Sequence, residues 1–270
     1  MSKDLGFDIV AYGADDPEMR RIVEILNERN IPCLPAKKNG DRVHAGNAYE
    51  ADNTEDFIGK RVLIIECAFV ADKVDVVRVI DHHRPGMPGD HAHMDSEQFW
   101  EASSLARILA IFGQDDRVLA AMDHCFNKAV QGLCPGVTSE EVLEMKIRQI
   151  AKGTGVSDKE AMDAIDLFRS SLGSFPSHFI GNVEVMMIEP GSIGYSLEYL
   201  TAQVAAVLEK RAILLAVKDS ENEQTRLHLC GDVKAETIDH FLNVWAPCRG
   251  LEKLYGSPAR GYAGGYVKKE

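Results

Sequence analysis

Short apolar runs alternate with a helical period along the first half of the chain. Residues 8–12, 61–66 and 74–80 are compact apolar runs bounded by charged residues, which predicts buried strands. Between the first two runs, an apolar pattern spaced i, i+3, i+4, i+7 extends from Met19 to Leu26. This spacing places the apolar side chains on one face of an amphipathic helix. The alternation predicts an α/β fold built on a parallel sheet.

Each of these apolar runs ends at acidic residues. The first leads into Asp15 and Asp16, the second ends at Glu66, and the third ends at Asp81. In an open parallel sheet, sites form at the carboxyl ends of the strands. The sequence therefore predicts that carboxylates from three strands meet at one edge of the sheet, where they can hold a metal. The alternative for the first pair is that these acids, followed by Pro17, only open the helix.

The middle of the chain has the pattern of a helical segment. Helices are predicted at 97–112 and 116–131. Two capping-box patterns follow, Thr138 with Glu141 and Ser157 with Glu160, and each predicts the start of a helix. The second of these helices is expected to end near Leu172, and the pair reads as a connector.

A second alternation of strands and helices follows the connector. Strands are predicted at 183–188, 212–217 and 225–230, and helices at 195–209 and 234–245. The tail is rich in glycine and tyrosine. We therefore expect an α/β domain over 1–136, a helical connector over 137–174 and a smaller α/β domain over 175–270.

The composition narrows the classes of partner. The net charge of −12 argues against a binder of long duplex nucleic acid, which is held through Lys and Arg, but it leaves small phosphorylated substrates open. The six cysteines include no C-x-x-C pair, so free thiols are expected rather than a zinc cluster. No apolar run is long enough to span a bilayer, and the first residues lack the apolar stretch of a signal peptide. A cytoplasmic protein without membrane partners is expected.

The sharpest chemical signal is Asp81-His82-His83 at the end of the third apolar run. One carboxylate and two imidazoles in sequence bring several metal-binding groups close together. Adjacent side chains face different ways, so one histidine is expected to bind metal while the other group orients it or meets the substrate. The alternative is a loop with two solvated histidines, because a short motif needs its context.

The context resembles the DHH phosphoesterase superfamily. The resemblance rests on Ile80-Asp81-His82-His83, on the Ser/Ala-rich segment from Ala102 to Arg107 and on the order of the domains. It implies a DHH catalytic domain at 1–136 and a DHHA1-like substrate domain at 175–270. It also implies hydrolysis of a small phosphate ester or a short oligonucleotide by a metal-activated water.

The family's other motifs can be matched residue by residue. The resemblance implies the metal ligands Asp16, Glu18, Glu66, His82 and Asp123, with Asp81 and His83 in catalytic roles. Tyr12 stands where the family has a histidine, and tyrosine is a poor ligand near neutral pH. Hard oxygen ligands with one imidazole suit Mn²⁺ or Mg²⁺, one or two ions.

Histidines outside this set are less certain ligands. His124 is expected to be exposed rather than a second ligand. His91 and His93, in the loop that follows the DHH tripeptide, are candidates to compensate for Tyr12, with a solvated loop as the alternative.

The tail loosely resembles the family's glycine-rich substrate motif. Arg260 stands in the position of a histidine, and the substrate-binding candidates are Arg260, Tyr262, Gly264 and Gly265. Arginine binds phosphate in a fork, glycine lets a backbone approach closely, and tyrosine can stack on a base. An ordinary glycine-rich turn is the alternative.

Three functions are therefore weighed. A metal-dependent phosphoesterase comes first, a pyrophosphate or polyphosphate hydrolase second, and a non-catalytic nucleotide-binding regulatory protein third. The expected partner is a small phosphorylated compound or a short nucleotide, and a homodimer is left open.

Overall fold

The computed structural model describes residues 5–44, 46–83, 95–189, 197–219 and 224–267, which fold as two compact units. Unit 1 comprises Met1–Met94 and Gln98–His124, and unit 2 comprises Asp95–Glu97 and Cys125–Glu270. His91 and His93 lie outside the described residues. The three-part division expected from the sequence stays a prediction.

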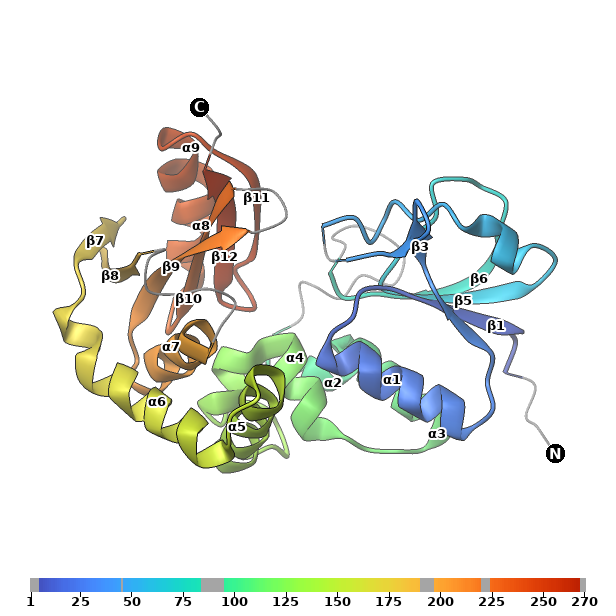
Figure 1. Cartoon of the computed structure of the whole chain (residues 1–270), viewed down its shortest axis with the longest axis horizontal. Coiled ribbons are helices and arrows are strands. Elements are labelled where there is room, and N and C mark those ends of the chain that lie inside the picture. Colours follow the sequence, from blue (N-terminus) through green and yellow to red (C-terminus); the bar gives the residue numbers. More distant parts are fainter. Residues whose placement is uncertain (1–4, 45, 84–94, 190–196, 220–223, 268–270) are drawn as a thin grey trace. The chain divides into compact units, whose positions relative to one another are not determined.

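Unit 1 is built on a four-stranded parallel sheet in the order β2-β1-β5-β6 (Figure 1). Its strands are β1 (Ile9–Tyr12), β2 (Cys33–Pro35), β5 (Arg61–Ile65) and β6 (Asp75–Ile80). The α/β fold class with a parallel sheet is confirmed. Strand β2 was not predicted, because three residues carry too little pattern.

The predicted burial is right for the inner strands and wrong for β6. Val10 and Leu63 on the two central strands are fully buried. Strand β6 is an edge strand, and its Val76 and Val77 are exposed. Valine favours a pleated surface whether or not it is covered, so the valine run identified the strand but not its burial.

Helices pack against this sheet. They are α1 (Pro17–Glu28), α2 (Phe99–Ala102) and α3 (Ser104–Phe112), with the first residues of α4 (Arg117–Val130). Helices α1 and α3 pack on each other (Figure 1). The remaining elements of unit 1 are β3 (Lys37–Lys38), β4 (Asp41–Arg42) and the 3₁₀ turn η1 (Thr54–Phe57).

Two of the predicted helices are interrupted. The helix expected over 97–112 breaks at Ser103, whose extended backbone (φ −60°, ψ 134°) makes it the N-cap of α3. The helix expected over 116–131 contains a non-helical residue, Cys125 (φ −150°, ψ 56°), at the boundary between the two units. Neither break involves glycine or proline, the residues that signal helix ends in a sequence.

Unit 2 is built on a six-stranded mixed sheet in the order β11-β12-β10-β9-β8-β7. Its strands are β7 (Ser177–Ile180), β8 (Val183–Ile188), β9 (Ala212–Asp219), β10 (Gln224–Gly231), β11 (Leu251–Ser257) and β12 (Tyr262–Val267). Only the β8–β9 pair is parallel among the described strands of this sheet. The predicted strands at 183–188, 212–217 and 225–230 are confirmed.

Helices cover both faces of this sheet. They are α5 (Ser139–Thr154), α6 (Asp158–Ser171), η2 (Leu172–Ser174), α7 (Leu197–Leu208), α8 (Ala235–His240), the π-helical turn η3 (Phe241–Trp245) and α9 (Ala246–Cys248). Helix α7 packs on one face and α8 with η3 on the other. Both predicted capping boxes are confirmed, with each Glu side chain bonded back to its cap. The described residues contain no helix long and apolar enough to cross a membrane.

The glycine-rich tail forms the hairpin β11–β12 rather than a loop. Gly264 lies opposite His228 on β10, and a Cβ added to it would lie 2.3 Å from Cζ of Tyr255 and 2.7 Å from the carbonyl oxygen of Leu227. A Cβ on Gly265 would lie 2.6 Å from Leu254. Close packing accounts for both glycines, and their part in substrate binding stays a prediction.

Candidate metal centre

The acidic ends of the strands meet at the carboxyl edge of the sheet in unit 1, as predicted. The backbone N–H of Gly13, after β1, donates to the carbonyl of Ile65 at 3.0 Å, and that of Glu66 donates to Ile80 at 2.9 Å. A Cβ on Gly13 would lie 2.3 Å from the carbonyl oxygen of Glu66. The strand ends therefore approach so closely that only glycine fits at position 13. Glu66 itself has a left-handed backbone (φ 51°), which is rare for a residue with a side chain.

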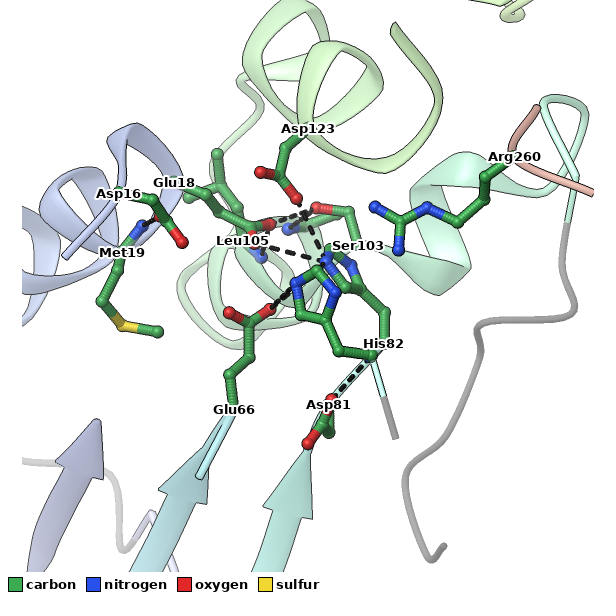
Figure 2. A network of polar contacts seen from close by, with 12 residues as sticks. Asp16, Glu18, Met19, Glu66, Asp81, His82, Ser103, Leu105, Asp123 and Arg260 are labelled. Atoms are coloured by element: carbon green, nitrogen blue, oxygen red, sulfur yellow. Dashed lines mark hydrogen bonds and ion pairs between the residues drawn. The ribbon is translucent and has the colours of Figure 1, made fainter. Parts of the chain in front are cut away.

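His82 lies just after the end of β6 at this edge of the sheet. Its side chain is completely buried, and its Nε2 atom lies 3.4 Å from Oε1 of Glu66 and 3.1 Å from Oδ2 of Asp123 (Figure 2). Oε2 of Glu18 is 3.9 Å from the same nitrogen. Carboxylates from α1, from α4 and from the residue after β5 thus lie within 4 Å of one imidazole nitrogen.

Glu18 is held in place by the helix α3. Its Oε1 atom accepts hydrogen bonds from the hydroxyl of Ser103 at 2.8 Å and from the backbone N–H of Leu105 at 2.7 Å (Figure 2). The positive end of α3 favours this negative charge. Oε2 is buried and accepts no hydrogen bond from a described residue, so it is available on the side of His82.

Asp123 and His124 come from the last turn of α4 before its break. Asp123 was predicted as a ligand, and the structure brings it to His82. The expectation that His124 is exposed is wrong. Only 1% of it is accessible, and its ring centroid lies 5.4 Å from that of His82. Both residues immediately precede the non-helical Cys125.

Asp16 lies at the N-terminus of α1. Its Oδ1 atom accepts a hydrogen bond from the backbone N–H of Met19 at 2.7 Å, so it caps the helix. Capping was the alternative expected for the first acidic pair, and the role of Asp16 as a metal ligand stays a prediction. Tyr12, in the histidine position of the family motif, is half-buried, and burial raises the pKa of its phenol above the ordinary value.

His83 and Asp81 flank the buried histidine. Nε2 of His83 lies 2.9 Å from Nε2 of His82 and 3.8 Å from Oε1 of Glu66, and 40% of its side chain is accessible. Oδ1 of Asp81 accepts the backbone N–H of His83 at 2.6 Å. Asp81 is buried, and its carboxylate stabilises the turn that carries the two histidines.

Two sets of side chains can hold a cation. One consists of Glu66, His82 and His83, the other of Glu18, His82 and Asp123, and the ligand atoms in each lie within 4.8 Å of one another. Asp16 and Asp81 belong to neither set among the described residues. Buried oxygens of Glu18 and Glu66 without a hydrogen-bond donor fit a divalent cation, because such oxygens otherwise need a donor.

The carboxylates raise one another's pKa values. Burial raises the pKa of Asp16 to about 7, and the charges of Asp123 and Glu66 act in the same direction. Burial raises the pKa of Glu18 well above its ordinary value, again with Asp123 and Glu66 contributing. The pKa of Glu66 is also raised, mainly by burial, although His82 acts against this. The cluster is therefore unfavourable as a set of bare anions.

Sequence reasoning did not identify Ser103 or Arg42. Ser103, the cap of α3, is bonded to Glu18, and although it lies in the Ser/Ala-rich segment of the resemblance, this contact was not predicted. The guanidinium of Arg42 donates to the carbonyls of Gly13 and Ala14 at 3.0 and 2.9 Å. Arg42 is remote from this loop in sequence, so no local pattern could reveal the contact.

The proposed substrate residues lie in unit 2. Arg260 is buried, its Nη1 donates to the hydroxyl of Tyr262 at 3.4 Å, and its guanidinium lies 5.3 Å from the centroid of the Tyr262 ring. His228 packs beside this ring at 6.2 Å and is stacked on Tyr255. His228 was not predicted, and burial lowers its pKa to about 3, so the ring is neutral.

Comparisons with known proteins add little. No family model and no curated protein matches the sequence. Among solved structures, the chain is similar to a pGpG-specific phosphodiesterase, PggH of Vibrio cholerae, at 10% identity and a TM-score of 0.45, over 96% of this chain and 92% of that one. It is also similar to a putative family II inorganic pyrophosphatase of Methanococcus jannaschii at 14% identity and a TM-score of 0.22, over 96% and 84% of the chains. Similarity this low carries no conclusion about activity.

The raised pKa of Asp16 predicts how the stability of the metal-free protein depends on pH. Because the folded state binds a proton that the unfolded state releases near pH 4, Asp16 destabilises the fold progressively as the pH rises toward its folded pKa of about 7. Asp16→Asn keeps a capping side chain but cannot ionise. The variant should therefore gain stability relative to the wild type between about pH 5 and about pH 8, measured by urea denaturation in EDTA.

The neighbouring Asp15→Asn is the matched control. The hydrogen bond from Arg20 lowers the pKa of Asp15, so this carboxylate is ionised throughout the range from about pH 5 to about pH 8. The difference in free energy of unfolding between Asp15→Asn and the wild type should therefore not change with pH. If the free energy of unfolding of wild type and of Asp16→Asn changed with pH in parallel, the pKa of Asp16 would not be raised in the folded state.

Proposed function

We propose that unit 1 carries a divalent-metal-dependent phosphoesterase centre that hydrolyses a small phosphate ester or a short oligonucleotide. The observation that carries the proposal is the meeting of Glu18, Glu66 and Asp123 around Nε2 of His82. Each ionised carboxylate makes ionisation of its buried neighbours less favourable. A bound cation offsets this repulsion, so a buried cluster of carboxylates favours cation binding. The motif resemblance to the DHH phosphoesterases supports the same reading.

The ligand chemistry favours Mn²⁺ or Mg²⁺. The set offers carboxylate oxygens with one or two imidazoles and no thiolate ligand. Hard oxygen ligands suit these ions, and a single imidazole favours Mn²⁺ over Mg²⁺. Such an ion supplies a polarised phosphate oxygen and an activated water when it is bound.

His83 is the proposed contact with the reacting phosphate. Its side chain is 40% accessible, whereas that of His82 is completely buried, so His83 can reach a substrate. An imidazole there can donate a hydrogen bond to a phosphate oxygen or a proton to the leaving oxygen. Asp81 positions this ring through its hydrogen bond to the backbone of His83.

Arg260 is the proposed phosphate contact of unit 2. Nη1 of its planar guanidinium contacts the Tyr262 hydroxyl at 3.4 Å, and a guanidinium has the fork geometry that phosphate prefers. Tyr262 is half-buried, and a tyrosine ring is of the kind on which a base can stack. A short nucleotide presents both groups, a phosphate and a base.

The direct test is hydrolysis of bis-p-nitrophenyl phosphate and of a linear dinucleotide with Mn²⁺, Mg²⁺ or EDTA. Turnover should require the metal, and Glu66→Gln or His82→Ala should lower it by about 100-fold or more, because each removes a ligand. His178→Ala is the matched control, since His178 is exposed in unit 2. A folded wild type that turns over neither substrate with any divalent ion would favour a nucleotide-binding regulatory protein. Faster turnover of pyrophosphate would favour the pyrophosphatase alternative.

The substrate contact is tested with Arg260→Gln. Loss of a charged hydrogen bond to phosphate should raise KM by about 10- to 100-fold and leave kcat within a few-fold. Arg211→Gln, an exposed arginine of the same unit, should leave KM unchanged. Circular dichroism of both variants separates binding from folding. An unchanged KM in folded Arg260→Gln would remove Arg260 from the substrate site.

A further inference from the structure

We propose that Cys125 and Cys134 of unit 2 form a redox-sensitive pair, which a peroxide oxidises to a disulfide. Their Sγ atoms lie 3.3 Å apart, and only 2% of each residue is accessible. Sulfurs joined in a disulfide are about 2.0 Å apart, so a shift of about 1 Å brings these two to bonding distance. Neither cysteine belongs to the ligand sets of the metal centre, so this inference goes beyond the proposed function.

The end of α4 brings the two cysteines together. Gly132 has a left-handed backbone (φ 72°), and the N–H groups of Gly132 and Leu133 each donate to a carbonyl of the last helical turn at 3.0 Å. These bonds form a Schellman motif, which ends the helix and reverses the chain. Cys134, the next residue, therefore returns to the side of Cys125, which lies at the break in the same helix.

A second turn begins at Cys134 itself. The backbone N–H of Val137 donates to the carbonyl of Cys134 at 3.2 Å, with Pro135 and Gly136 (φ 75°) at the two central positions. Proline followed by a glycine of positive φ is the pattern of a type II turn. Turns on both sides of Cys134 fix its backbone, so the pairing of the two thiols is specified by local structure.

The position of Cys134 allows an oxidant to reach it. The residues around it, Leu133, Pro135 and Gly136, are exposed, so a small local opening of the turn uncovers its thiol. The hydrogen bond with Cys125 lowers the pKa of the Cys134 thiol, although burial acts in the opposite direction. A thiolate is the form that reacts with peroxide, so Cys134 is expected to react first.

The other buried cysteines differ from this pair. Burial raises the pKa of the thiols of Cys67 and Cys230 well above the ordinary value. A buried thiol with a raised pKa is inert, because it rarely ionises. Oxidation inside the fold should therefore select Cys134 and its neighbour over these two cysteines.

The reaction has two steps. The Cys134 thiolate attacks one oxygen of hydrogen peroxide, the O–O bond breaks, and the departing hydroxide takes up a proton to become water. Cys134 is then a sulfenic acid. The sulfur of Cys125 attacks it, the S–S bond forms, the S–O bond breaks, and the hydroxyl leaves as water with the proton of the Cys125 thiol. The pair loses two electrons and two protons, and the peroxide is reduced to two waters.

The experiment is peptide mapping of the folded full chain after treatment with hydrogen peroxide in EDTA. The protein is unfolded in an alkylating reagent, digested and examined by mass spectrometry. A peptide that joins Cys125 to Cys134 is expected, with a loss of about two mass units for the two hydrogens, and dithiothreitol should restore both thiols. Cys248→Ser, which removes an exposed cysteine, should form the same bridge. If exposed Cys248 is oxidised in the wild type while Cys125 and Cys134 are both still alkylated, the inference is overturned.

A serine variant tests the order of the two steps. In Cys125→Ser the second step is blocked, so the sulfenic acid on Cys134 should persist and be trapped by dimedone. The wild type should show little of this adduct, because Cys125 removes the intermediate. Absence of the adduct from peroxide-treated, folded Cys125→Ser would contradict the inference. If this variant does not fold, the peptide map of the wild type still decides.

Discussion

The repulsion among buried carboxylates around His82 is the constraint on which unit 1 depends. Glu18, Glu66 and Asp123 come from three different elements, and their side chains are turned toward one imidazole nitrogen. Taking such groups out of water is costly, and bringing them together adds to the cost. Under the proposed function, a bound cation would reverse the sign of the interaction.

The surrounding structure is organised to keep the carboxylates in place. The serine cap and the first turn of α3 bind one oxygen of Glu18, which leaves the other facing His82. Gly13 permits the close approach of the loop after β1 to the strand end at Glu66, whose backbone is left-handed. The left-handed backbone of Glu66 is strained, and strained residues of this kind cluster at functional sites. Preorganised ligands lose less entropy when an ion binds.

Much of the centre could be predicted because its signals are local. Asp81-His82-His83 and Glu66 each follow an apolar strand, and parallel strands bring such ends together. Asp123 was implied by the family resemblance, and the structure places its Oδ2 3.1 Å from Nε2 of His82. The burial of His124 could not be found in this way, because its ring packs 5.4 Å from that of His82, a contact between segments far apart in the sequence.

Long-range packing explains the other differences. The glycines of β12 looked like a phosphate loop, but the ring of Tyr255 and the backbone of Leu227 require Gly264. The valines of β6 indicated a strand, but not that it lies at the edge of the sheet. Arg42 reaches the loop after β1 across the fold, and only the structure brings them together.

The central claim is that the carboxylates around His82 form a cation site, and anomalous X-ray diffraction from a crystal grown with Mn²⁺ tests it most directly. The account predicts an anomalous peak in contact with Nε2 of His82 and with carboxylate oxygens of Glu18, Glu66 or Asp123. Manganese bound elsewhere on the chain, with this position filled only by water or by hydrogen bonds among the side chains, would contradict it.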